Sequence, residues 1–149
     1  MNKATAILES TPEKAAEQIF RAHRHETAWL DAFTESLDHR RAGESLARTL
    51  AVWGTSQAEA ARLVGVSRQA VGKWLQRGAP PARAGAFADL AAATELLVRH
   101  LKRDRIPAVV RRPIPALGGV SLMDLLARSD TRSLLGACRD MFRFDRIQA

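Results

Sequence analysis

The stretch from Gly54 to Gly78 constrains the fold of this 149-residue chain more than any other part. It contains two segments with apolar residues at helical spacing, and a serine suited to cap a helix, Ser56 or Ser67, precedes each. Gly65 stands between them, where a left-handed residue can turn the chain sharply. The second segment ends in basic residues before a further glycine. The pattern predicts a helix-turn-helix.

Apolar positions assign an inner face to each of these two helices. Small alanines in the first helix allow a close crossing, and Glu59 stands three residues after Ser56, which predicts a capping box. The residues expected inside are Ala60, Ala61, Leu63 and Val64 in the first helix, and Val71, Trp74 and Leu75 in the second.

The outer face of the second helix carries side chains of the kinds that DNA recognises. Arginine can bind guanine O6 and N7, glutamine can bind adenine N6 and N7, and serine or lysine can hold phosphate. The first helix adds a phosphate site at its amide end, where unpaired N–H groups and the helix dipole favour an anion. The predicted DNA-binding residues are Ser56, Gln57, Ser67, Arg68, Gln69, Gly72, Lys73, Gln76 and Arg77, and Arg62 and Arg83 would extend the phosphate contacts. The alternative is an ordinary helical hairpin whose polar side faces solvent.

The charge distribution agrees with a polyanionic partner for this segment. The chain carries a net charge of +7 and has a pI near 10.9. Residues 1–40 hold five Lys or Arg and seven Asp or Glu, whereas residues 41–85 hold seven and two. The balance therefore changes from −2 to +5 where the predicted helix-turn-helix begins.

The N-terminal part is expected to be helical from Ser10, which can cap while Glu13 reaches back. One kinked helix or two short ones fit the pattern as far as Arg40, and a separate scaffold helix is expected from about Gly43 to Trp53. This part also holds several apolar residues that either form a dimer contact or pack on the core, namely Trp29, Leu30, Phe33 and Leu37. No metal site is expected from His23, His25 and His39, because His-x-His places two rings on different helix faces.

The C-terminal part predicts a long helix, a proline-bearing stretch and two further helices. The long helix ends near Arg103, and its inner face should cover the helix-turn-helix. A glycine pair follows, then a capping box of Ser121 and Asp124, and then a last helix capped by Asp130 or Ser129. The long helix is marked by Phe87, Leu90, Thr94, Leu97, Val98 and Leu101, and the last helix by Leu134, Leu135, Cys138, Met141 and Phe142.

Two parts of the sequence resemble known families. Residues 46–75 resemble the Xre and phage-repressor helix-turn-helix, whose "Ser-Gln-x-Glu-x-Ala-x-x-x-Gly-Val-Ser" core matches residues 56–67. The C-terminal part resembles the toxin-binding domain of the Xre/MbcA/ParS antitoxins, through a turn and helix that read Leu-Gly-Gly-Val-Ser-Leu-Met-Asp-Leu-Leu at residues 117–126. Leucine replaces the proline usual in the family at position 122. The two resemblances span about residues 44 to 144 in the family's order.

The resemblance implies an antitoxin of a type II toxin-antitoxin system. Such a protein neutralises a cognate RES-domain toxin, an enzyme that degrades NAD, and represses its own operon. Helix-turn-helix modules usually pair to read two half-sites of double-stranded DNA, so a homodimer is also expected. The alternative is a free-standing phage or plasmid repressor without a toxin partner. The expected architecture is all-α, with the helix-turn-helix at 41–85 and a toxin-binding domain at 86–149. The N-terminal helical part at 1–40 is an extension that smaller members of the family lack. By analogy, the toxin contacts are Arg139, Arg143, Phe144, Asp145 and Arg146.

Several classes of function are not expected. The apolar runs are too short to cross a bilayer and no leader segment opens the chain, so the sequence predicts a soluble cytoplasmic protein. The single cysteine cannot form an internal disulfide or supply a usual zinc site. No nucleophile with a base partner and no phosphate loop is apparent, so neither an enzyme nor a bound cofactor is expected.

Overall fold

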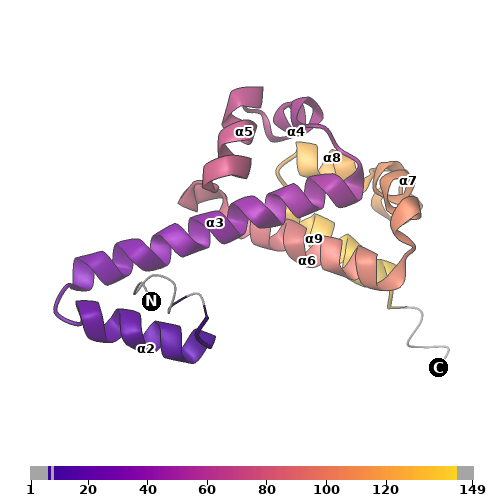
Figure 1. The fold of residues 1–149 in the computed structure, drawn as a ribbon. Coiled ribbons are helices and arrows are strands. Elements are labelled where there is room, and N and C mark those ends of the chain that lie inside the picture. The colour runs from indigo at the N-terminus through magenta and orange to yellow at the C-terminus, as the bar shows by residue number, and fades with distance from the viewer. Residues whose placement is uncertain (1–6, 8, 144–149) are drawn as a thin grey trace. The chain divides into compact units, whose positions relative to one another are not determined.

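The fold of this chain is all-α, as predicted. The computed structural model describes residue 7 and residues 9–143, and within this part helices alternate with short turns and no β-strand is present (Figure 1). The chain forms two compact units, Met1–Asp38 and His39–Ala149. The helix α3 (Thr27–Trp53) contributes residues to both units.

The first unit contains α2 (Pro12–His23) and the start of α3. Two helices rather than one kinked helix therefore occupy the predicted N-terminal extension. The cap of α2 is Thr11, whose hydroxyl accepts a bond from the N–H of Lys14 at 3.4 Å. The predicted cap, Ser10, instead donates to the carbonyl of Ile7 at 2.9 Å. Pro12 is the first residue of α2, a position that suits proline because the N–H it lacks would have no partner there. The cap is therefore Thr11, one residue later than predicted.

The predicted separate scaffold helix starting near Gly43 is wrong, since α3 continues through this residue to Trp53. Gly43 does not end a helix; it allows the backbone near Trp74 and Gly78 to lie close to α3. A Cβ atom there would collide with the carbonyl oxygen of Trp74 and would lie 3.0 Å from Cα of Gly78. The glycine lets the end of the helix-turn-helix pack directly on α3, and this contact offsets the weak helix propensity of glycine.

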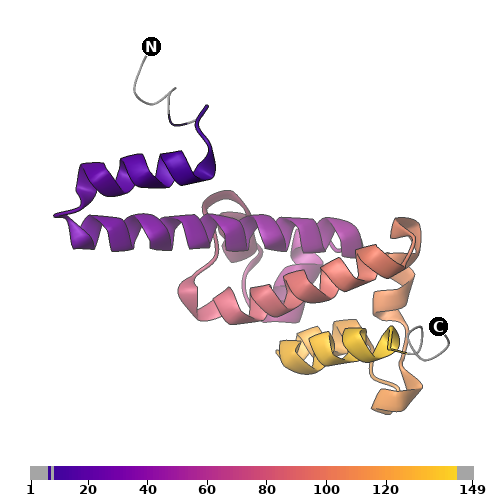
Figure 2. The same ribbon diagram turned by 90° about the horizontal axis from the view of Figure 1, so that it is seen from below.

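In the second unit, helices shorter than α3 pack on two sides of its later half (Figures 1 and 2). On one side of α3 lie α4 and α5, and on the other side α6 and α9 run side by side. The elements after α3 are α4 (Gln57–Val64), α5 (Arg68–Arg77), the 3-10 turn η1 (Pro81–Arg83), α6 (Ala84–His100), the 3-10 turn η2 (Arg103–Arg105), α7 (Ile106–Arg111), the 3-10 turn η3 (Pro115–Leu117), α8 (Leu122–Ala127) and α9 (Thr131–Met141).

One hydrophobic core joins the two halves of this second unit. Trp53, Leu97, Leu122 and Leu134 are all buried in it, and they come from α3, α6, α8 and α9. The segments 41–85 and 86–149 therefore share one hydrophobic core. Their division into a DNA-binding and a toxin-binding domain stays a prediction. Leu122, which stands where the resembling family has proline, is fully buried and fills core space.

A small polar network crosses this core between α3 and α6. The Trp53 indole N–H donates to the hydroxyl of Thr94 at 3.1 Å, and the hydroxyls of Thr49 and Thr94 are 3.2 Å apart. All three residues are buried. Because buried polar groups are costly when unpaired, this network favours one relative placement of α3 and α6.

The C-terminal part contains the predicted glycine turn and the predicted caps. Gly118 and Gly119 have φ of 71° and 83°, and the N–H of Ile114 donates to the carbonyl of Val120 at 3.1 Å. Ser121 forms the capping box of α8, and Asp130 rather than Ser129 caps α9. Burial raises the pKa of the Cys138 thiol to about 12, which agrees with a small core residue and not a reactive thiolate.

Candidate nucleic-acid interface

Both caps predicted for the helix-turn-helix are present. The Ser56 hydroxyl accepts from the N–H of Glu59 at 3.1 Å, and the Ser67 hydroxyl accepts from the N–H of Ala70 at 3.1 Å. Between the two helices, Gly65 has φ of 73° and its N–H bonds to the carbonyl of Ala61. The local geometry of the turn is therefore the one that these serines and this glycine predict.

The inner face of the motif packs on the core of the second unit. Ala60, Ala61 and Val71 are buried, and the partly buried residues Leu63, Trp74 and Leu75 pack against the same cluster. The Trp74 and Phe87 rings pack edge to face, with their centroids 5.7 Å apart. The guanidinium of Arg83, predicted to extend the phosphate contacts, lies 5.4 Å from the centroid of the Trp74 ring.

The predicted DNA-binding residues form one exposed side of α4 and α5. Only Gly72 among them is half-buried, and a Cβ atom there would lie 3.7 Å from Oε1 of Gln57. This places the first residue of α4 beside the middle of α5, so the predicted phosphate site adjoins the predicted base-reading face. The exposed members are Ser56, Gln57, Ser67, Arg68, Gln69, Lys73, Gln76 and Arg77. Their role on DNA stays a prediction.

Arg111 is a contact residue that the sequence did not indicate. Its Nη1 donates to the carbonyls of Trp53 at 2.8 Å and Pro107 at 2.9 Å, and its Nη2 donates to the carbonyl of Gly54 at 3.1 Å. The same nitrogen lies 3.3 Å from the carboxylate of Glu59. The predicted capping box of α4 is therefore wrong in its second half: Ser56 caps the helix, but the Glu59 carboxylate pairs with Arg111 of α7. These bonds tie α7 to the turn before α4, across a sequence separation that local patterns do not reveal.

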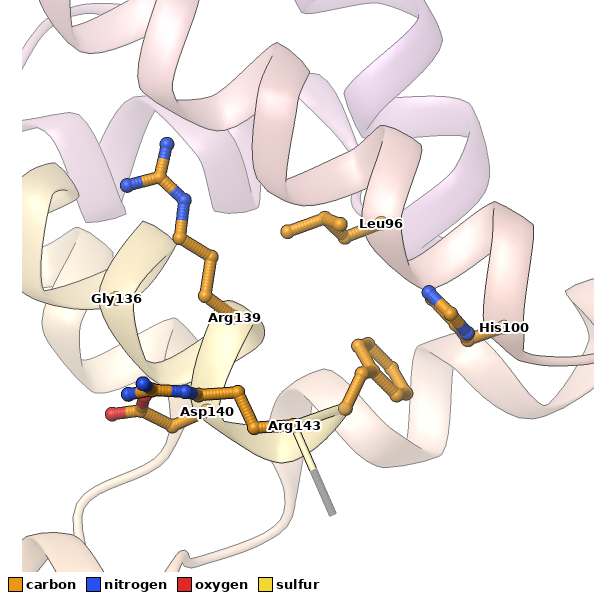
Figure 3. A pocket seen from close by; sticks show the side chains of 7 residues that line it. Leu96, His100, Gly136, Arg139, Asp140 and Arg143 are labelled. Carbon is orange, nitrogen blue, oxygen red and sulfur yellow. The ribbon is translucent and has the colours of Figure 1, made fainter. Parts of the chain in front are cut away.

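A second surface lies between α6 and α9 (Figure 3). It encloses a pocket of about 410 Å³, and Arg139 and Arg143, two of the predicted toxin contacts, line it. The His100 and Phe142 rings stack with centroids 4.4 Å apart at one wall. Nη1 of Arg143 lies 3.5 Å from the carboxylate of Asp140. The predicted contacts Phe144, Asp145 and Arg146 lie outside the described residues.

A second, apolar hollow of about 320 Å³ lies beside the C-terminal end of α9. Leu117 of η3 and Met141 of α9 line it, and Asp140 borders both this hollow and the pocket between α6 and α9. Leu117 keeps 38% of its surface exposed. The end of α9 therefore presents cationic and apolar side chains together, a mixture suited to a protein partner.

The histidines considered as metal ligands are engaged in other contacts. The His23 ring stacks on Trp29 with centroids 3.5 Å apart, and Nδ1 of His23 lies 3.3 Å from Glu26. Nε of Arg24 donates to Nε2 of His25 at 3.1 Å. Among residues 7 and 9–143, no three His, Cys, Asp or Glu side chains group closely enough to hold a metal ion. In the same part of the chain, no helix is both long and apolar enough to cross a membrane.

Comparison with known proteins gives one structural likeness. No protein-family model matches the sequence, and no curated protein does. The structure is similar to a chain in the crystal structure of the M. tuberculosis MbcT-MbcA toxin-antitoxin complex, with a TM-score of 0.55 and 20% sequence identity. The alignment covers 66% of this chain and 91% of that chain. The shared feature is the fold.

Proposed function

We propose that this chain is a DNA-binding antitoxin. It neutralises a RES-domain toxin that degrades NAD, and it represses its own operon as a homodimer. The observation that carries this proposal is the fold shared with a chain of a toxin-antitoxin complex over 91% of that chain's length. The sequence resemblances at residues 56–67 and 117–126 support the same assignment independently of the fold. The protein acts by binding and has no catalytic role.

The proposed DNA contact uses α4 and α5 together. The exposed face of α5 enters the major groove, where Arg68 and Gln69 have the donors and acceptors to read base edges. The capped amide end of α4 at Gln57 holds a backbone phosphate beside that groove. Two copies read two half-sites about 34 Å apart, the spacing typical of dimeric helix-turn-helix proteins.

The proposed toxin contact uses the end of α9. Arg139 and Arg143 provide cations beside an apolar pocket, a combination suited to an enzyme cleft that binds anionic NAD. In Figure 1, α4 and α5 lie on one side of α3 and α9 lies on the other. The two proposed partners therefore bind different faces of the second unit.

Co-expression tests the antitoxin assignment. The chain is produced with the product of the adjacent reading frame, and complex formation, cellular NAD and growth are measured. We expect a stable complex, with NAD depletion when the neighbour is produced alone and its restoration by this chain. A double substitution, Arg139→Glu with Arg143→Glu, should weaken the complex while DNA binding persists. DNA binding without any complex would overturn the antitoxin assignment and favour the free-standing repressor.

A further inference from the structure

Positive charge is concentrated in the segment that follows α6. Residues 99–112 contain six Lys or Arg and one Asp. Four of the cations lie in or beside η2 and α7 and are exposed, namely Lys102, Arg103, Arg105 and Arg112, hereafter the η2–α7 edge. Within the described part of the chain, none of these four makes an ion pair. The charge of this edge is therefore left for an anionic partner to neutralise.

Two contacts hold the η2–α7 edge beside the start of α4. Arg111 bonds to the carbonyls of Trp53 and Gly54, and Pro107 packs so closely that a Cβ at Gly54 would lie 3.3 Å from its Cγ. Two residues after Gly54, Ser56 caps α4. Because Arg111 engages four acceptors, it positions α7 and is not itself available to a ligand.

The chemistry of the edge favours a polyanion over a protein surface. Protein interfaces are centred on buried apolar or aromatic anchors. The large apolar residues of this segment, including Ile106 and Val110, point into the core, and none between residues 99 and 112 is exposed. Binding to a phosphate chain needs cations at suitable spacing and no such anchor.

We propose that the η2–α7 edge binds DNA phosphates next to the one held by the amide end of α4. This inference rests on the proposed function, because it extends the same DNA contact into the C-terminal half of the chain. Phosphates on one strand follow each other about every 3.4 Å along the duplex axis. Because the η2–α7 edge is fixed beside Ser56, it lies near the phosphates that neighbour the one bound at the start of α4. The added contact is independent of base sequence.

The salt dependence of DNA binding tests the inference with the full-length protein. The dissociation constant is measured at several salt concentrations for a random duplex and for the DNA upstream of the coding sequence. The variant Arg105→Gln with Arg112→Gln should lower the slope of log K against log salt by about 1.8 on both duplexes, the value for two lost phosphate contacts. The ratio of specific to random affinity should stay unchanged. Lysine at both positions should restore the slope.

The matched control is Arg128→Gln with Arg132→Gln. These two exposed arginines flank the turn between α8 and α9, which lies at the opposite, C-terminal end of α4 beside Val64. The control removes the same net charge and should leave the slope at the wild-type value. An equal fall in both variants would indicate a general charge effect and would overturn the inference.

Three further outcomes separate the inference from the function on which it rests. An unchanged slope for Arg105→Gln with Arg112→Gln, together with lost specificity for Arg68→Ala, overturns the inference alone. A lowered slope with specificity unaffected by Arg68→Ala supports the edge and overturns base reading by α5. Loss of the toxin complex by the edge variant, with its DNA slope unchanged, assigns the edge to an acidic protein and overturns the DNA contact.

Discussion

Gly43 illustrates how a single residue fixes the placement of the helix-turn-helix. We expect Gly43→Ala to lower the free energy of unfolding by about 1–3 kcal/mol, because its Cβ would collide with the backbone at Trp74 and a backbone contact relaxes poorly. Urea unfolding measures the change. Gly85→Ala in α6 is the control, since a Cβ there meets nothing within 4 Å. It should be neutral or stabilising by about 0.4–1 kcal/mol. Equal destabilisation by both would contradict the close-approach explanation.

Arg111 acts through the backbone carbonyls that end α3. Replacing it by methionine keeps much of the side-chain length but leaves the carbonyls of Trp53 and Gly54 without their donor. We expect the free energy of unfolding to fall by about 1–2 kcal/mol, toward the low end of the roughly 1.5–3 kcal/mol for hydrogen bonds to charged groups, because the site is partly exposed. Arg112→Met should leave stability unchanged, because Arg112 is exposed and has no such acceptors in the described structure. A stability loss shared by both variants would remove the special role of Arg111.

At the scale of elements, α5 carries the prediction about base reading. Arg68→Ala and Gln69→Ala should each cost about 1–3 kcal/mol of binding free energy on the operator and relax base preference there. Arg77→Ala, near the end of the helix, should weaken binding to all duplexes alike. Titrations with operator and random DNA distinguish these effects. Equal losses on both duplexes for Arg68→Ala would show that α5 contacts phosphates and does not read bases.

The sequence predicted those elements whose signals are local. The caps at Ser56, Ser67 and Ser121 and the turn at Gly65 depend on bonds within a few residues, so their spacing was sufficient. The continuity of α3 was missed, because Gly43 reads as a break unless the distant carbonyl of Trp74 is known.

Long-range partners also explain the missed contact between Arg111 and Glu59. The two residues are 52 positions apart, and only the completed fold brings α7 to α4. The candidate DNA face was predictable as a set of residues, since helical periodicity separates its exposed positions from the apolar ones. The support of that face by α7 was not predictable, because no periodic pattern records a contact between separate elements.

At the scale of the whole molecule, the first unit lacks a core of its own. Among its described residues, including all of α2, none is buried. Phe20 is 61% exposed, Trp29 38% and Leu37 46%. An apolar groove of about 660 Å³ between α2 and the start of α3 is lined by Ile19, Trp29 and Phe33. α2 has 12 residues, a length at which an isolated helix is marginal, so packing against a partner would stabilise the hairpin.

The proposed homodimer supplies that partner, and the charges of α2 suit it. The first half of α2 holds Glu13, Lys14 and Glu17, a net charge of −1, whereas its end holds Arg21, which pairs with Glu17, and is capped by Arg24. An antiparallel pairing of α2 with its copy therefore sets acids opposite bases around the exposed Phe20. A two-fold pairing of this kind also matches the symmetry of a dimeric operator.

Substitutions on this hairpin test the dimer. Phe20→Glu with Leu37→Glu should convert the protein to a monomer in light scattering, because charge replaces two exposed apolar contacts. Operator affinity should then fall toward that of a single half-site, while the second unit keeps its unfolding transition. Ala47→Glu changes an exposed position of the same helix α3 and should leave the dimer intact. A dimer that survives the double substitution, or deletion of residues 1–38, would move the contact to the second unit.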